Sequence, residues 1–365
     1  MKNFNCSCGN RVNYQNYQCV SCNAELGFQP DSLEITDFHP VEEGLYRASN
    51  SDRLYKKCAN YSHYNVCNWL VDADDDDDLC LSCRMTQAIP NLNIEGNLKL
   101  WYRMEDAKRR LLYSLMKLEL PFEGVAKHGN HKLGFAFLED QVADEYGNEL
   151  TVKDYVSTGH SHGLITINLD EADPSKRLKM REQLQERYRT LLGHFRHESG
   201  HFFWDLLINN SDFLEEFRSL FGDERLDYQA ALQNYYQSGP APEWEKVWIS
   251  AYASMHPWED WAETWAHYLH MVDTLETANN MEFSIGENLL LNPLKKHDHK
   301  VEQQEETIFD QMFDDWCTLS ITLNALNRSM GLDDAYPFVI SSSAINKLHF
   351  VHRVIESSAV ANIKY

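Results

Sequence analysis

The sequence has few positive charges and no long apolar run. Lysine and arginine together number 33 against 56 acidic residues, which gives a formal net charge of -23 at pH 7. Because such a surface repels phosphate groups, the charge balance argues against nucleic acids and anionic membrane surfaces as partners. No segment approaches roughly 18 consecutive apolar residues, and the N-terminal residues lack the apolar core of a signal peptide. We therefore expect a soluble, cytoplasmic protein.

Several catalytic signatures are also missing from the sequence. It contains no P-loop, no G-x-S-x-G motif, no glycine-rich dinucleotide-binding motif and no internal repeat. These absences argue against nucleotide-dependent chemistry and against a serine hydrolase of the α/β type. The length of 365 residues leaves room for about two or three domains.

Cysteines are concentrated near the N-terminus, where eight of the nine lie within the first 83 residues. Paired cysteines in a chain without a secretion signal indicate metal thiolates in a reducing compartment rather than disulfides. The first set has two closely spaced pairs, each followed by a residue that tolerates positive φ, Gly9 or Asn23. We predict a structural zinc here, with a redox-active dithiol as the alternative. Its ligands are Cys6, Cys8, Cys19 and Cys22.

The second cysteine set has looser spacing but ends in a regular C-x-x-C pair. We predict a second structural zinc bound by all four cysteines. The alternative is one zinc-binding pair with two buried free cysteines. A region of this kind commonly binds a protein partner, and we divide it into modules at residues 1–30 and 31–95. The second set consists of Cys58, Cys67, Cys80 and Cys83.

An H-E-x-x-H motif, His197 to His201, lies in a segment that we predict to be one helix from about residue 174 to 208. Residues four apart lie one turn apart on the same helix face, so both imidazoles can bind one Zn²⁺ while Glu198 handles a metal-bound water. The alternative is an ordinary helix with two histidines. A predicted strand at 162–169 precedes this helix, and its exposed edge is expected to pair with an extended peptide.

The third metal ligand is expected in the helix predicted after Pro257. Glu259, Glu263 and His267 lie on one face of this helix, and burying carboxylates without partners is costly. Metal binding explains their presence if Glu259 is the ligand and Glu263 accepts the N–H of a zinc-bound histidine. The reverse assignment of the two glutamates remains open. Aromatic residues on another face are predicted to form the core: Trp258, Trp261, Trp265 and Tyr268.

The order of these motifs resembles the gluzincin metallopeptidases, particularly the anthrax-lethal-factor-like branch. The H-E-x-x-H is followed by Tyr252 and then by Pro257-x-Glu259-x-x-Ala262-Glu263. The whole chain is similar to the bacterial "putative zinc-binding metallopeptidase" family, in which a zinc-ribbon region precedes the peptidase. In that branch a tyrosine seven residues before the glutamate ligand faces the metal. The resemblance therefore favours Glu259 as the ligand and implies that Tyr252 donates to the tetrahedral oxyanion.

These observations predict an α+β protein. Two small Cys₄ zinc modules precede a mainly helical, zincin-like metallopeptidase domain at residues 96–365, which contains a small edge-stranded sheet. The expected function is hydrolysis of peptide bonds in a peptide or protein substrate, with one catalytic and two structural Zn²⁺ ions and Glu198 as general base. The alternative is a non-catalytic zinc-binding adaptor that uses its N-terminal modules for protein–protein contact.

Overall fold

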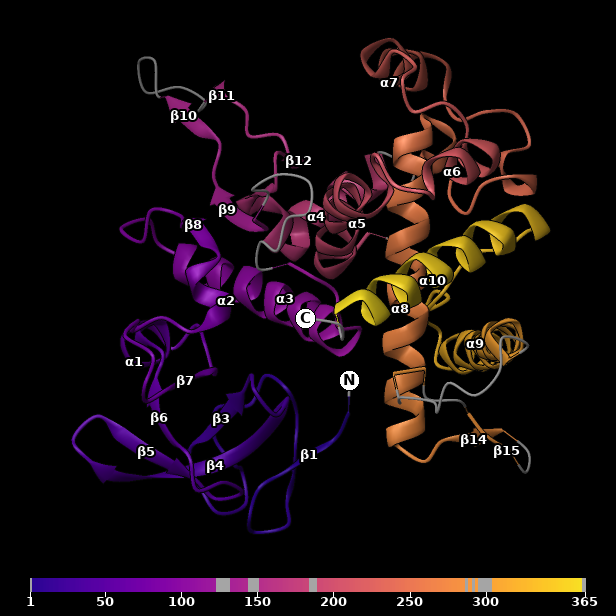
Figure 1. Cartoon of the computed structure of the whole chain (residues 1–365). Helices are drawn as coiled ribbons and strands as arrows, with labels where there is room; N and C mark the ends of the chain where they lie inside the picture. Colours follow the sequence, from indigo (N-terminus) through magenta and orange to yellow (C-terminus); the bar gives the residue numbers. More distant parts are fainter. Residues whose placement is uncertain are drawn as a thin grey trace. The chain divides into compact units, whose positions relative to one another are not determined.

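The computed structural model describes residues 2–122, 132–143, 151–183, 189–285, 288–290, 293–294 and 304–362. The chain forms two compact units, shown in Figure 1. The first contains residues 1–113 and 133–184, and the second contains residues 114–132 and 185–365. Helix α3 (Asn97–Lys117) contributes residues to both. The mixture of small sheets and a mainly helical C-terminal region confirms the predicted α+β class.

The N-terminal part of the first unit is built on an antiparallel sheet with strand order β3-β4-β5-β6-β7. A bridge between Phe28 and Trp69 also links the two ends of this sheet, and their rings lie 4.7 Å apart in its core. A hairpin of β1 (Phe4–Asn5) and β2 (Arg11–Val12) precedes the sheet. The five strands are β3 (Leu26–Gln29), β4 (Glu34–Glu42), β5 (Leu45–Ala48), β6 (Leu54–Lys57) and β7 (Leu70–Asp72).

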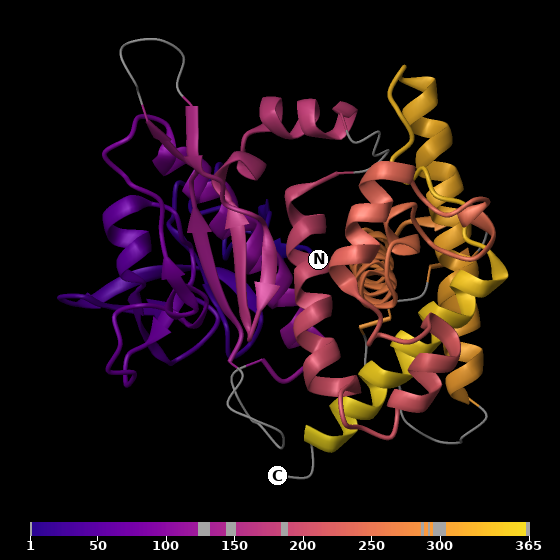
Figure 2. The same ribbon diagram turned by 90° about the horizontal axis from the view of Figure 1, so that it is seen from above.

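A second sheet in this unit has strand order β12-β13-β9-β8, and its strands β9, β12 and β13 are drawn in magenta in Figure 2. Strand β13 (Leu164–Asn168) lies between β12 (Gly159–Ser161) and β9 (Gly134–Leu138), so the prediction that it offers an exposed edge is wrong. The reason is a two-residue turn, His162-Gly163. Both residues have positive φ, 50° and 88°, which is the geometry of a tight hairpin that folds β12 onto β13.

The shorter elements of the first unit complete this description. Strand β8 (Thr86–Ala88) pairs in parallel with β9, and β10 (Gln141–Ala143) pairs with β11 (Thr151–Asp154). The short helices α1 (Ala59–Tyr64) and α2 (Leu81–Arg84) each follow directly after a cysteine, Cys58 and Cys80 respectively. Two of the four cysteines of the second set, Cys58 and Cys80, therefore lie at helix starts.

The helix predicted over residues 174–208 is two helices, so the prediction of one continuous helix is wrong. Arg189 and Thr190, which lie between α4 (Pro174–Gln183) and α5 (Leu191–Phe203), are not helical. The residue before α5, Thr190, is extended, with φ -126° and ψ 151°, and its side chain accepts a hydrogen bond from the N–H of Gly193 at 3.0 Å. This N-cap starts a new helix at Leu191. A π-helical turn, Trp204–Ile208, follows α5.

The second unit is organised around the long helix α8 (Pro257–Asn280), against which α5, α6, α9 and α10 pack (Figures 1 and 2). Trp261, Trp265 and Tyr268 are buried in this core, as predicted, whereas Trp258 is only half-buried. The other elements are α6 (Leu214–Phe221), α7 (Tyr228–Ser238), β14 (Ser284–Ile285), β15 (Asn288–Leu289), α9 (Gln304–Ser329) and α10 (Ser342–Asn362).

Helices α5 and α8 approach each other closely at the two central residues of the H-E-x-x-H motif. A Cβ atom on Gly200 would lie 2.9 Å from the Cα of Ala262, so only glycine fits at this position without movement. The indole N–H of Trp261 donates to the Gly200 carbonyl at 2.8 Å, and that of Trp265 donates to Ser199 Oγ at 3.1 Å. These contacts fix the position and orientation of the H-E-x-x-H motif relative to the first turns of α8.

Among the residues that the structure describes, none of the helices combines the length and the apolar character that crossing a bilayer requires.

Candidate metal centre

Two histidines of α5 and one glutamate of α8 converge on a single point. The candidate ligand atoms of His197, His201 and Glu259 all lie within 4.8 Å of one another. The Glu259 carboxylate is 2.9 Å from Nε2 of His197 through one oxygen and 3.5 Å from Nε2 of His201 through the other. Donor atoms bound tetrahedrally to zinc at its usual bond lengths lie about 3.3 Å apart. The spacing therefore fits a zinc ion.

The hydrogen bonds of His197 show why a cation suits this point. Its Nδ1 donates to Glu263 Oε1 at 2.6 Å, and the other oxygen of Glu263 accepts from Ser250 Oγ at 2.6 Å. A neutral His197 therefore directs the lone pair of Nε2 at the Glu259 carboxylate. Two electron-rich atoms at 2.9 Å require a proton or a metal ion between them.

In the absence of metal, a proton meets this requirement. Burial lowers the pKa of His197, but its hydrogen bonds to Glu259 and Glu263 outweigh burial and raise that pKa well above its usual range. Burial raises the pKa of Glu259, but the neighbouring His201 and His197 outweigh burial and hold that pKa well below its usual range. The site is thus built to hold a positive charge between two histidines and a carboxylate, which is the chemistry of a zinc site.

The remaining member of the motif, Glu198, is buried, with 8% of its surface exposed. Burial raises the pKa of its carboxyl group, and the charges of the neighbouring histidines partly offset this effect. In the described part of the chain, Glu198 does not belong to the convergent set of three ligands. A carboxyl group with a raised pKa that lies beside a metal site without being one of its ligands has the properties of a proton acceptor.

Tyr252 lies in a short 3₁₀ turn, Tyr252–Ser254, directly before α8. Its ring centroid is 5.9 Å from that of His197. Burial raises the pKa of its phenol well above the usual range, so the hydroxyl group keeps its proton and can donate a hydrogen bond. The tyrosine singled out in the sequence therefore lies beside the metal point.

Three further residues contact the centre without a signal in the sequence. Tyr228 donates from its hydroxyl group to Glu259 Oε1 at 2.8 Å, and Ser250 contacts Glu263 as described above. The ring of Trp258 lies 4.1 Å from the ring of His201, so its prediction as a core residue is wrong. Helical spacing places Trp258 on the same face of α8 as the aromatic core residues. At the first turn of the helix, however, this face lies against the metal site and not in the core.

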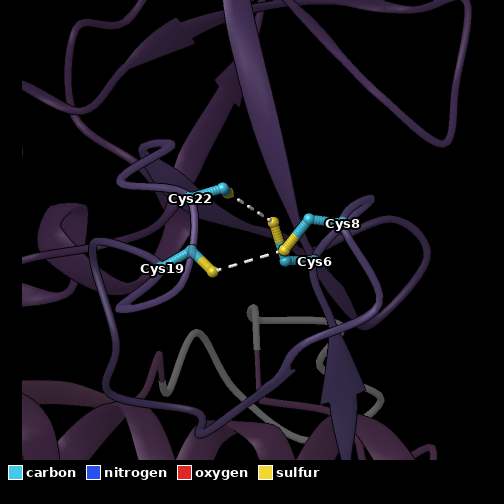
Figure 3. Close-up of side chains that lie close together, drawn as sticks. All are labelled: Cys6, Cys8, Cys19 and Cys22. Atoms are coloured by element: carbon cyan, nitrogen blue, oxygen red, sulfur yellow. Dashed lines mark hydrogen bonds between the residues drawn. The ribbon is translucent and has the colours of Figure 1, made fainter.

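The first cysteine set is brought together as predicted (Figure 3). The sulfur atoms of Cys6 and Cys22 are 3.5 Å apart, and those of Cys8 and Cys19 are 3.7 Å apart. Sulfur atoms around a tetrahedral zinc lie about 3.8 Å apart, whereas a disulfide bond is about 2.05 Å long. Gly9 and Asn23 adopt positive φ, 84° and 62°, which confirms the prediction made for the turns after each pair.

The second cysteine set also converges, and all four of its members are buried. The sulfur of Cys67 accepts a hydrogen bond from the backbone N–H of Trp69 at 3.3 Å, and that of Cys58 accepts from the N–H of Cys80 at 3.4 Å. Backbone N–H groups directed at sulfur stabilise thiolates. Convergence of all four excludes the alternative in which two of these cysteines are separate from the pair Cys80 and Cys83.

Comparisons with known proteins agree with this geometry. The family described as "putative zinc-binding metallo-peptidase" matches residues 97–354, and a zinc-ribbon domain matches residues 3–94. Uncharacterized proteins of Mycobacterium bovis and Mycobacterium tuberculosis are each 38% identical over 361 residues, covering 98% of this chain and 96% of theirs. No solved structure matches the chain. The chain belongs to the family described as "putative zinc-binding metallo-peptidase", with a zinc-ribbon domain at its N-terminus.

Proposed function

We propose that this protein is a zinc-dependent peptidase whose catalytic zinc is bound by His197, His201 and Glu259. The observation that carries the proposal is the convergence of these three side chains, with Glu198 next to them but outside their set. Three protein ligands leave a fourth position on a tetrahedral zinc, which is the pattern of catalytic sites, whereas structural sites use four. A buried glutamate outside the ligand set has no purpose in a structural site.

The contacts of the two glutamates favour one assignment over the other. Glu259 faces the Nε2 atoms of both histidines, whereas Glu263 accepts hydrogen bonds from His197 Nδ1 and Ser250. We assign Glu259 as the ligand and Glu263 as the residue that orients His197 and fixes its tautomer. A carboxylate behind a zinc-bound histidine also increases the electron density that its Nε2 offers to the metal.

Peptide hydrolysis follows from the positions of the remaining groups. Zinc, when bound, supplies Lewis acidity that makes water nucleophilic near neutral pH and polarises the scissile carbonyl. Glu198 accepts the proton of the attacking water and returns it to the leaving amine. The protonated Tyr252 hydroxyl donates to the oxygen on which negative charge develops, a contribution commonly on the order of 3 kcal/mol.

We further propose that both cysteine groups hold structural zinc and that the zinc-ribbon region binds a protein partner or the substrate protein. The eight cysteines of the two groups are all reduced and form two convergent sets. Free thiols arranged in this way suit a reducing compartment such as the cytoplasm.

A single substitution separates a peptidase from a non-catalytic zinc-binding adaptor. Glu198→Gln keeps the size of the side chain but removes its ability to accept a proton. With a fluorescence-quenched random peptide library as substrate, we expect activity to fall about 10²- to 10⁴-fold while the zinc content stays at the wild-type level. If the zinc-loaded wild-type protein and the variant cleave equally, or if neither cleaves, the adaptor function is favoured instead.

A further inference from the structure

A tyrosine outside the predicted site, Tyr228, contacts a ligand of the metal centre. Its hydroxyl group is 2.8 Å from Glu259 Oε1. A carboxylate can only accept hydrogen bonds, so the single proton of Tyr228 is directed to Glu259.

The fold holds Tyr228 in place from two sides. Tyr228 is the first residue of α7, which Asp227 caps by accepting a backbone hydrogen bond. His256 caps α8 by accepting at Nδ1 from the N–H of Trp258, so its proton is on Nε2 and is donated to the carbonyl of Leu226 at 3.1 Å. The same imidazole therefore starts α8 and ties down the turn that leads into α7. This tie brings the Tyr228 hydroxyl to Glu259.

The ring of Tyr228 has contacts that are independent of its hydroxyl group. Its centroid is 5.3 Å from the ring of His256 and 6.2 Å from the ring of Trp258, both in edge-to-face orientations. Phenylalanine at this position would keep both contacts. The contribution of the hydroxyl group can therefore be separated from that of the ring by one substitution.

We propose that Tyr228 is a positioning residue that fixes the Glu259 carboxylate for zinc. The proposal rests on the zinc site assigned above. Glu259 rotates freely about its terminal bond unless one oxygen is held, and the bond from Tyr228 leaves the other oxygen directed at His197 Nε2. Partners of this kind, which touch a ligand rather than the metal, commonly contribute 10- to 100-fold to metal affinity.

Zinc affinity tests this proposal without depending on peptidase activity. In the full-length protein, competition with a zinc chelator should show 10- to 100-fold weaker binding at the His197 site for Tyr228→Phe. His197→Ala identifies which of the bound zinc ions belongs to this site. Tyr236→Phe is the matched control because it removes a hydroxyl group from the same helix at a position that is 65% exposed. Tyr252→Phe should retain wild-type affinity.

Three outcomes would overturn the proposal. Wild-type affinity in Tyr228→Phe, confirmed in Tyr228→Leu as a second variant without the hydroxyl group, would show that Glu259 needs no such support. An equal loss in Tyr236→Phe would show a general effect of altering α7. A wild-type protein that binds no more zinc than His197→Ala would contradict the zinc site itself, and the proposed function would then fail together with this inference.

Discussion

The two units hold metal-binding groups of different design. Each cysteine group in the first unit supplies four sulfur atoms, which complete a tetrahedron, whereas the second unit supplies two imidazoles, one carboxylate and a glutamate outside the set. The thiolates come from turns and helix starts within 83 residues, but the histidines and Glu259 come from two packed helices. A closed site stabilises a small fold, and a three-ligand site leaves a position for chemistry.

The difference extends to what holds each group together. In the second unit, tryptophan hydrogen bonds and the close contact at Gly200 keep α5 and α8 in register without any metal. In the first unit, the helices that begin directly after Cys58 and Cys80 have only six and four residues and are too short to be stable alone. We therefore expect zinc to be needed for folding in the first unit and for function in the second.

The largest expected effect is the loss of a structural zinc. Cys83→Ser should remove one zinc and much of the folding free energy that it supplies, on the order of 10 kcal/mol for a structural zinc. Cys317→Ser is the matched control, because Cys317 lies outside both cysteine groups. Zinc content and thermal unfolding measure the effect. A Cys83→Ser protein with the wild-type Tm would contradict the expectation that the first unit, unlike the second, needs zinc to fold.

Acid should destabilise the second unit through histidines that do not bind metal. Burial lowers the pKa of both His267 and His352 to about 4, and each is hydrogen-bonded to a tyrosine hydroxyl group. The unfolded chain binds protons at its histidines near pH 6.5, so stability is complete above about pH 6.5 and is lost as the pH falls toward 4. Each histidine accounts for about 3 kcal/mol at full extent.

Denaturant unfolding at pH 7.5 and pH 5 measures this loss, and the His197→Ala background excludes a contribution from metal release at the His197 site. Replacing His352 by glutamine should make the free energy of unfolding less dependent on pH, because glutamine does not titrate. An unchanged pH dependence in that variant would contradict the assignment.

The contact between α5 and α8 is expected to be sensitive to one added side chain. Gly200→Val would place Cβ 2.9 Å from the Ala262 backbone and 3.2 Å from Trp265, which should cost about 3 kcal/mol and weaken zinc binding at His197. Gly159→Val is the control, because a Cβ at Gly159 meets no atom within 4 Å. Loss of stability at both glycines alike would argue against a specific role for this contact.

The smallest expected effect concerns the support of His197. Ser250→Ala removes the hydrogen bond to Glu263 and should lower zinc affinity about tenfold, with little change in Tm. Ser254→Ala, in the adjacent 3₁₀ turn, removes a hydroxyl group that bonds only to backbone atoms in the structure and should keep wild-type affinity. If the two variants bind zinc equally well, Glu263 does not depend on Ser250.

Local spacing in the sequence predicted the features that depend on neighbouring residues. The four-residue interval of the H-E-x-x-H motif placed two imidazoles on one helix face, and short cysteine intervals with Gly9 and Asn23 predicted the turns of the first zinc group. These features follow from backbone geometry alone, because one helical turn or one tight turn fixes them.

Features that depend on distant contacts could not be predicted in this way. Tyr228 reaches Glu259 across 31 positions only because His256 ties the two helix starts together. Thr190 separates α4 from α5 with a cap that apolar periodicity does not reveal, and the hairpin at His162 covers the strand edge that had been expected to be free. In each case a hydrogen bond or turn outweighed the pattern of apolar residues.

Zinc per chain, measured by elemental analysis, tests the central claim most directly. The wild-type protein should contain three zinc ions, and the double variant His197→Ala with Glu259→Ala should contain two, because the two cysteine groups are unaffected. Three falling to two would establish a metal site held by these residues. Two zinc ions in both proteins would contradict the account, because the second unit would then bind no zinc and the proposed chemistry would have no metal.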